Sequence, residues 1–207
     1  PVHAAPVALE ELPAVLPLAV LAIEDRRFYS HNGVDWLGVV RAAVRNVLAR
    51  RVVQGGSTIT QQLAKNLFLT SERSFQRKIR ELLLAFWLEH RFTKNQLLTI
   101  YLNRVYLGGG TYGVEAASQR FFGKASRDLN LSEAAMIAGL LKAPSRYAPT
   151  RNLELAQSRA GQVINSMVAA GWLNEDDALI AKSSPAGPTG AYTGSSGARY
   201  FIDWVLE

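Results

Sequence analysis

The stretch PLAVLAIED, residues 17–25, indicates the fold class, because a proline is followed by six apolar residues without a charge. Pro17 suits the first position of a helix, where its missing N–H is not needed. The apolar run from Leu18 to Ile23 ends abruptly at Glu24 and Asp25. We therefore expect a buried helix with a carboxylate at its end. Helix signals are strong along the chain and strand signals are weak, which predicts a mainly α fold.

On the C-terminal side of this stretch, hydrophobic periodicity and capping residues predict further helices. The segment 36–53 is basic and amphipathic, and the capping-box spacing of Thr58 and Gln61 opens a helix that runs to about residue 69. Pro144 and Gly171 are expected to end two of the later helices. The remaining helices are expected from near residue 71, from Thr93 and Gln96 to the glycines at 108–110, over 113–122, 132–142 and 152–170, and after the cap Asn174.

The composition fits a folded domain with an anionic partner. Of the 207 residues, 48% are hydrophobic, and 23 Lys and Arg against 17 Asp and Glu give a net charge of +6. This charge suits phosphate, nucleic acid or a membrane surface, without choosing among them. Because the sequence has no cysteine, disulfides and thiolate metal sites are excluded.

The two ends of the chain suggest a piece of a larger protein. No apolar stretch reaches the roughly 18 residues that span a bilayer, and residues 1–16 lack the basic start of a signal peptide, so we expect any transmembrane anchor to lie outside this chain. Ser, Gly, Pro and Thr dominate 183–197, which is typical of a linker. We expect one domain over 1–182, and over 183–207 a linker and the start of a truncated downstream region.

Glu24 is the first candidate for chemistry. A carboxylate that ends an apolar run lies against the core, where loss of hydration raises its pKa and suits it to general acid or base work. A helix-end Asp and Glu pair in solvent is an equally good interpretation of the spacing alone.

The segment GGSTITQQ, residues 55–62, is the second candidate. Its glycines allow close approach of a ligand, and the helix that follows offers free N–H groups to a phosphate. Thr58, Gln61, Gln62 and Lys65 are expected to share a polar face, opposite an apolar one. An ordinary capped surface helix explains the same pattern.

Two further clusters are less specific. Arg77 and Lys78 lie one turn before Glu81, so two cations and a carboxylate can converge, either as a solvated salt-bridge face or as a clamp for a diphosphate. Tyr101 and Asn103 lie in an aromatic and aliphatic helix, where the Asn could orient a substrate or simply accompany core packing.

Two other patterns do not indicate a functional site. Gly108, Gly110 and Gly113 match GxGxxG, but they follow a helix rather than a strand, so a dinucleotide site is excluded. His3, His31 and His90 have no metal-ligand spacing, and we expect no metal site.

Together these segments resemble, in order and spacing, the transglycosylase domain of class A penicillin-binding proteins and their monofunctional relatives, glycosyltransferase family 51. The similarity runs from about residue 14 to residue 172. Residues 24–35 fit EDxxFxxHxGxD, 55–62 with Lys65 and Asn66 fit the second motif, 77–81 fit RKxxE, 101–108 fit YLNxxYxG, and 121–144 is similar to a fifth region.

The resemblance implies a lysozyme-like helical domain with a head lobe and a smaller membrane-facing jaw lobe at about 36–53. It implies polymerisation of lipid II, a polyprenyl-diphosphate-linked disaccharide-peptide, into β-1,4 glycan strands with inversion and release of polyprenyl diphosphate. Glu24 is then the expected base and Glu81 the second catalytic carboxylate. The residues expected to bind substrate are Asp25, Phe28, His31, Ser57, Thr58, Gln61, Gln62, Lys65, Arg77, Lys78, Tyr101 and Asn103.

The resemblance also implies partners and a location. We expect lipid II and the growing glycan strand as ligands, a membrane surface contacted by the jaw, and no nucleic acid. The expected location is the extracytoplasmic, periplasmic face of a bacterial cell membrane. No cofactor is expected to be required, with a divalent cation such as Mg or Mn left open. The longer protein is expected to be bifunctional, although no Ser here has a Lys three residues later, so this chain should not bind β-lactams covalently.

Two alternatives remain at the level of the sequence. A lysozyme-like enzyme that cleaves glycans would use Glu24 as a general acid. A basic binding module for membrane or nucleic acid would use the net charge and the Arg-rich segment 36–53, although no nucleic-acid motif is present.

Overall fold

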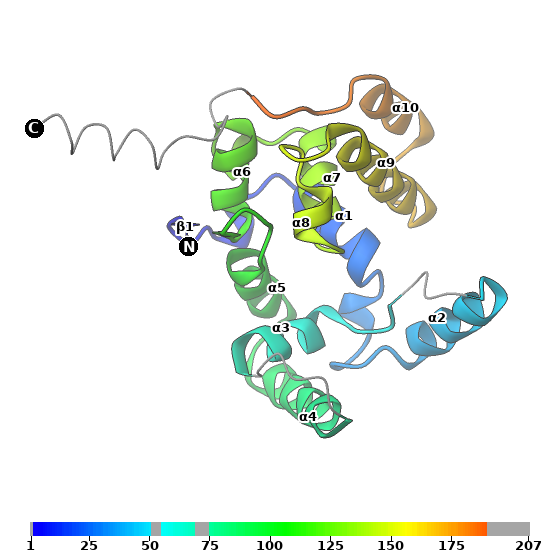
Figure 1. Cartoon of the computed structure of the whole chain (residues 1–207). Helices are drawn as coiled ribbons and strands as arrows, with labels where there is room; N and C mark the ends of the chain where they lie inside the picture. Colours follow the sequence, from blue (N-terminus) through cyan, green and yellow to red (C-terminus); the bar gives the residue numbers. More distant parts are fainter. Residues whose placement is uncertain (1, 51–54, 69–74, 190–207) are drawn as a thin grey trace, which may run out of the picture.

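The computed structural model describes residues 2–50, 55–68 and 75–189. Helices dominate this part of the chain (Figure 1), which confirms the predicted mainly α fold. Two short strands that the sequence did not predict, β1 (Val2–His3) and β2 (Thr111–Tyr112), pair in parallel. The helices are α1 (Val15–Glu24), α2 (Trp36–Leu48), α3 (Ile59–Phe68), α4 (Phe75–Arg91), α5 (Lys94–Arg104), α6 (Val114–Phe122), α7 (Leu131–Leu140), α8 (Pro144–Tyr147), α9 (Leu153–Ala169) and α10 (Glu175–Ser183), with 3-10 turns η1 (Leu9–Glu11), η2 (Phe28–Ser30) and η3 (Ser126–Asp128).

Helix α7 forms the centre of the core and packs against both α1 and α9. Every residue of α7 from Ala134 to Leu140 is buried. Small side chains at Ala134, Ala138 and Gly139 let the neighbouring helices approach closely. The apolar run of α1 is buried against this centre, so Glu24 is delivered to the edge of the core, as the sequence predicted.

Helices α3, α4 and α5 form a second packed group. The apolar side of α3 is buried, with Ile59 and Leu63 at 0% and 1% exposure. The amphipathic segment predicted at 36–53 forms α2, which stands at the periphery of the molecule (Figure 1). Its large apolar side chains, Trp36, Leu37, Val40, Val44, Val47 and Leu48, are exposed.

Three predicted boundaries were wrong. Helix α1 begins at Val15, so Pro17 is its third residue rather than its first; the first four helical N–H groups have no partner inside the helix, so the proline still fits. Helix α5 ends at Arg104, before the glycines, because Val105 adopts an extended backbone. Pro144 begins α8 instead of ending the helix before it, since α7 already ends at Leu140.

Other predictions fall partly outside the described residues. These are residues 51–53 of the amphipathic segment, the stretch from 69 to 74 where one helix was to end and the next to start, and 190–207 of the linker and downstream region. The predicted cap at Asn174 is confirmed, since its side chain accepts the backbone N–H of Asp177 at 2.7 Å. The lysozyme-like arrangement, the two lobes and the domain boundaries stay predictions.

Candidate active site

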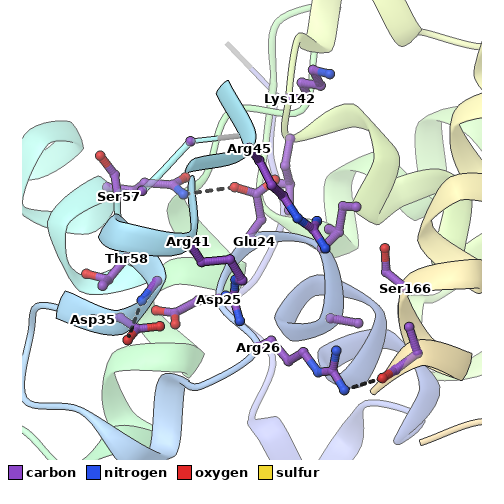
Figure 2. A pocket seen from close by; sticks show the side chains of 18 of the residues that line it. Glu24, Asp25, Arg26, Asp35, Arg41, Arg45, Ser57, Thr58, Lys142 and Ser166 are labelled. Atoms are coloured by element: carbon purple, nitrogen blue, oxygen red, sulfur yellow. Dashed lines mark hydrogen bonds between the residues drawn. The ribbon is translucent and has the colours of Figure 1, made fainter. Parts of the chain in front are cut away.

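A cavity of about 730 Å³ opens where the end of α1 meets α2, α3 and α9. Glu24 lies in its wall, with Ser57 and Thr58 to one side and Ser166 to the other (Figure 2). Cationic side chains outnumber carboxylates along this wall, so the cavity suits an anionic ligand. The cations are Arg26, Arg41, Arg45, Lys65, Lys142 and Arg159, and the carboxylates are Glu24, Asp25 and Asp35.

Glu24 is the last residue of α1 and is half-buried. Burial raises the pKa of its carboxyl group above the ordinary value of 4.5. A hydrogen bond from Gln62 and the positive charges of Arg159 and Lys142 oppose this rise, whereas the charge of Asp25 adds to it. Glu24 therefore has the raised pKa that the sequence predicted, in a wall where a ligand can reach it.

Gln62 and Tyr101 form a chain of hydrogen bonds behind Glu24. Gln62 Nε2 donates to Glu24 Oε2 at 2.8 Å, and the Tyr101 hydroxyl donates to Gln62 Oε1 at 2.9 Å. Gln62 lines the cavity, whereas the Tyr101 side chain is completely buried behind it. Burial, followed by the charges of Glu24 and Asp25, raises the pKa of Tyr101 well above 10.0, so its hydroxyl stays protonated.

Asp25, Phe28 and His31 make a buried joint between α1 and α3. His31 Nε2 lies 2.9 Å from Asp25 Oδ1, and the backbone N–H of Ile59 donates to Asp25 Oδ2 at 2.9 Å. Phe28 is 1% exposed and meets the His31 ring edge-on. Of these three predicted substrate-binding residues, only Asp25 lines the cavity.

The second predicted motif divides between the cavity and the core. The capping box is confirmed, since Thr58 N–H donates to Gln61 Oε1 at 3.0 Å and Gln61 N–H donates to Thr58 Oγ1 at 3.2 Å. Because this cap holds its side chain, Gln61 is buried and, unlike the other three residues of the predicted polar face, does not line the cavity. Ser57, Thr58, Gln62 and Lys65 line the cavity.

The predicted convergence of Arg77, Lys78 and Glu81 on one face of α4 is confirmed. Lys78 Nζ lies 2.5 Å from Glu81 Oε1, and Arg77 Nη1 lies 3.9 Å from Glu81 Oε2. Lys78 Nζ also donates to Ser57 Oγ at 3.1 Å. Since Ser57 lines the cavity and the other three do not, Ser57 links this cluster to the cavity wall.

Asn103 lies elsewhere. Its Oδ1 accepts the backbone N–H of Val7 at 2.9 Å, and its Nδ2 donates to the carbonyl oxygens of Val7 and Thr99, each at 2.9 Å. These bonds hold the N-terminal segment against α5, and Asn103 does not line the cavity.

Sequence reasoning missed Arg159, which lines the same cavity as Glu24. Arg159 is only 7% exposed, donates from Nη1 to Gln162 Oε1 at 2.9 Å, and lies over the ring of Tyr147. Burial lowers its pKa, while the charge of Glu24 acts in the opposite direction. The missed signal was an arginine within the apolar stripe of α9, three residues after Ala156 and four before Val163.

Arg41, Arg45 and Lys142 were also missed as cavity residues. The two arginines were predicted within a basic amphipathic segment, but the direction of their face depends on how α2 packs. Lys142 follows α7, and its positive charge lowers the pKa of Glu24.

The described residues contain neither a metal-binding cluster nor a membrane-spanning helix. No group of three His, Cys, Asp or Glu side chains in residues 2–50, 55–68 and 75–189 is arranged to hold a metal ion. No helix in the same part of the chain has the length and apolar character needed to cross a membrane.

Comparison with known proteins identifies the class to which this fold and cavity belong. A family model described as Transglycosylase matches residues 2–168. The chain therefore belongs to the transglycosylase family, as a peptidoglycan glycosyltransferase domain of the class A penicillin-binding protein type.

Individual relatives support the same assignment. Penicillin-binding protein 1A of Aquifex aeolicus is 48% identical over 179 residues, which cover 86% of this chain and 25% of that protein. Penicillin-binding protein 1F of Bacillus subtilis is 42% identical, with 88% and 26% covered. The crystal structure of penicillin-binding protein 1A from Haemophilus influenzae has the same fold, with a TM-score of 0.56 at 23% identity, over 97% of this chain and 20% of that one. The chain spans about a quarter of the length of these relatives.

Proposed function

We propose that this domain polymerises lipid II, with Glu24 as the general base. The observation that carries the proposal is a half-buried carboxylate of raised pKa in the wall of a strongly cationic cavity. A carboxylate whose pKa is raised accepts a proton more readily than an ordinary carboxylate does. Fixed cations around it stabilise the negative charge of a diphosphate leaving group.

In the proposed reaction the 4-hydroxyl of one lipid-linked disaccharide loses its proton to Glu24. The oxygen attacks the anomeric carbon of the growing chain from the face opposite the diphosphate, which gives inversion. The bond between that carbon and the diphosphate oxygen breaks, and polyprenyl diphosphate leaves with the electron pair. The proton stays on the Glu24 carboxyl until solvent removes it.

Lys65, Arg77 and Lys78 are proposed to bind the diphosphate. Lys65 is in the cavity wall, and Lys78 reaches that wall through Ser57. Glu81, buried at the centre of the cluster, orients the two cations of α4. Because these fixed charges take the place that a divalent cation would occupy beside a diphosphate, we expect polymerisation to continue in the presence of a chelator.

The cationic wall also distinguishes this function from lysozyme-like cleavage of glycans. Hydrolysis of a glycosidic bond also uses a carboxyl group of raised pKa, but its leaving group is an uncharged sugar. The six cations in the wall would stabilise the negative charge of a diphosphate, whereas an uncharged sugar develops no such charge to stabilise.

Glu24→Gln tests the function directly. We expect the variant to keep its fold and to lose at least about a hundredfold in the rate of glycan polymerisation from lipid II, since general base catalysis contributes roughly 10² to 10⁴. The measurement is the formation of glycan polymer, beside an assay for soluble fragments released from preformed peptidoglycan. Normal polymerisation by the variant, or fragment release by the wild type, would refute the proposal.

The exposed apolar face of α2 is proposed to contact the extracytoplasmic surface of the bacterial cell membrane. Arg41 and Arg45 of the same helix line the cavity. A helix that carries both the apolar face and these cations would place the entrance of the cavity at the membrane surface, where a lipid-linked substrate is found. We propose that the longer protein is bifunctional and that its anchor and transpeptidase domain lie outside this chain.

A further inference from the structure

The side-chain amide of Gln62 lies between Glu24 and Tyr101 and forms a hydrogen bond with each of them. Glu24 Oε2 lies 2.8 Å from Gln62 Nε2, and the Tyr101 oxygen lies 2.9 Å from Gln62 Oε1. An ionised carboxylate can only accept hydrogen bonds, so the NH₂ group of Gln62 must face Glu24 when Glu24 is charged. The carbonyl of Gln62 then faces Tyr101, whose hydroxyl must donate.

Rotation of the amide by half a turn would reverse both bonds. Gln62 Oε1 would face Glu24, an arrangement that suits only the protonated carboxyl, because its O–H can donate. The Tyr101 oxygen would accept from Gln62 Nε2, and its own hydrogen would need a different acceptor. Within the described part of the chain, Gln62 is the one hydrogen-bond partner that the Tyr101 hydroxyl has.

In the rotated state of the Gln62 amide, the hydrogen of the Tyr101 hydroxyl has no acceptor, and this destabilises the rotated state. Tyr101 is 0% exposed, so water does not replace the missing partner. A buried hydroxyl without a partner is unfavourable, and Tyr101 therefore holds Gln62 in the orientation that stabilises charged Glu24.

The other groups that face Glu24 do not set the orientation of the amide. The charges of Asp25, which directly follows α1, of Arg159 on α9 and of Lys142 after α7 all act on its carboxyl group. Arg41 and Arg45 of α2 and Lys65 of α3 line the same cavity. These charges shift the equilibrium of Glu24 through space, whereas Gln62 touches it.

We propose that Tyr101 and Gln62 are positioning residues, which together hold Glu24 in its proton-accepting state and orient its carboxylate toward the substrate. This inference rests on the proposed role of Glu24. It replaces the expectation that Tyr101 binds substrate, because the Tyr101 side chain is buried behind Gln62.

Tyr101→Phe tests the inference by removing one oxygen and keeping the ring. Without the hydroxyl, Gln62 can rotate freely and stabilise protonated Glu24. We expect the acidic limb of the pH–rate profile to move upward by about half to one pH unit, as the net value of one hydrogen bond implies. Below that limb kcat should fall about three- to tenfold, with KM unchanged.

The matched control is Tyr29→Phe. Tyr29 also donates its hydroxyl to a side chain, Asn95 Oδ1 at 2.9 Å, but on the surface and outside the cavity. We expect this variant to keep the wild-type pH profile. Thermal unfolding of both variants separates a change in stability from a change in the titration.

A direct titration makes the test independent of turnover. The carboxyl group of Glu24 can be followed by ¹³C NMR in glutamate-labelled wild-type protein, Tyr101→Phe, Gln62→Met and the double variant. Because Tyr101 acts through Gln62, we expect Tyr101→Phe to raise the titration midpoint of Glu24 when Gln62 is present. In the double variant, where Gln62 is already replaced by Met, we expect Tyr101→Phe to cause no further shift.

Each outcome decides the question. An unchanged midpoint in Tyr101→Phe, or an equal shift in both backgrounds, would overturn the inference. Inactivity of Glu24→Gln together with an unchanged midpoint would refute the positioning role alone. Full activity of Glu24→Gln would refute the role of Glu24 as the base, and with it the positioning role, whatever the midpoint does.

Discussion

The buried carboxylate of Asp25 accepts a hydrogen bond from the backbone N–H of Ile59 at 2.9 Å, across 34 positions of the chain. The same carboxylate lies 2.9 and 3.0 Å from His31 Nε2. Asp25 therefore joins the end of α1 to the start of α3. Glu24 directly precedes Asp25, and Gln62 lies three residues, about one helical turn, after Ile59. The joint between Asp25 and Ile59 therefore helps to set the distance between Glu24, the proposed base, and the side-chain amide of Gln62.

We expect Asp25→Ala to lower the free energy of unfolding by about 2 to 3 kcal/mol, because it removes hydrogen bonds to a buried charged group. Chemical denaturation of the purified protein measures this loss. Asp176→Ala is the matched control, since Asp176 is an exposed carboxylate on α10, and it should change stability little. Equal stability of the two variants would show that the joint contributes nothing.

Glu24 should make stability depend on pH. Its pKa in the folded protein is raised above 4.5 by burial, so the folded state holds its proton at a pH where the unfolded state has lost it. Stability contributed by this group therefore falls as the pH rises from about 4.5 to the folded pKa, and is constant above that. Glu24→Gln removes this dependence.

At pH 7 we consequently expect Glu24→Gln to be more stable than the wild type although it is inactive. Denaturation midpoints measured between pH 5 and pH 8 test this. The control is Glu154→Gln, which changes an exposed residue of α9 and should unfold as the wild type does. A variant less stable than the wild type across this range would contradict the prediction.

Lys78 should matter for catalysis through its contact with the cavity wall. Lys78→Gln removes the positive charge beside Ser57 Oγ and leaves Glu81 with a weaker partner. We expect kcat/KM for glycan polymerisation to fall by about 10- to 100-fold, because a hydrogen bond to a charged group contributes roughly 1.5 to 3 kcal/mol. Lys94→Gln is the control, because Lys94 pairs with Glu89 at 2.8 Å away from the cavity. The same loss in both variants would argue against a specific role.

Local parts of the site could be predicted from the sequence, and long-range parts could not. The Thr58 and Gln61 cap depends on residues three positions apart, and so does the pair of Lys78 and Glu81. Glu24 and Arg159 are 135 positions apart in the sequence, and only the packing of α1, α7 and α9 brings them to the same cavity. Spacing carries no information on such a contact.

Packing also decides which polar side chains reach the cavity. Gly139 is part of the reason that Arg159 does, because a Cβ at that position would lie 3.0 Å from the Arg159 side chain. The periodicity of the helix around Gly139 predicts its burial but not the side chain that crosses it.

The apolar face of α2 should bind membranes. We expect replacement of Trp36, Leu37 and Val40 by Ser to weaken binding to anionic vesicles by more than about tenfold, since each large apolar side chain contributes roughly 1.5 to 3 kcal/mol on burial. Vesicle sedimentation measures the change. The control replaces Leu179 and Ile180 of α10, which are 68% and 66% exposed. Equal effects of both replacements would show that binding is not specific to α2.

Asn103 should behave as a structural residue, since its side chain exchanges two hydrogen bonds with the backbone of Val7. We expect Asn103→Ala to lower the free energy of unfolding by about 1 to 2 kcal/mol, and to leave KM for lipid II unchanged. Hydrogen exchange at the Val7 amide should accelerate, because its acceptor is lost. Asn165→Ala, which removes an exposed acceptor of Lys182, is the control.

The two possible roles of Asn103 predict opposite results. If Asn103 bound substrate, KM would rise in Asn103→Ala while exchange at Val7 stayed slow. The geometry favours faster exchange with normal KM, because Oδ1 and Nδ2 are both engaged at 2.9 Å by backbone groups 96 positions away. Fast exchange at Val7 in the variant would show that Asn103 holds the N-terminal segment against α5. The same helix carries Tyr101, which contacts Gln62 behind Glu24.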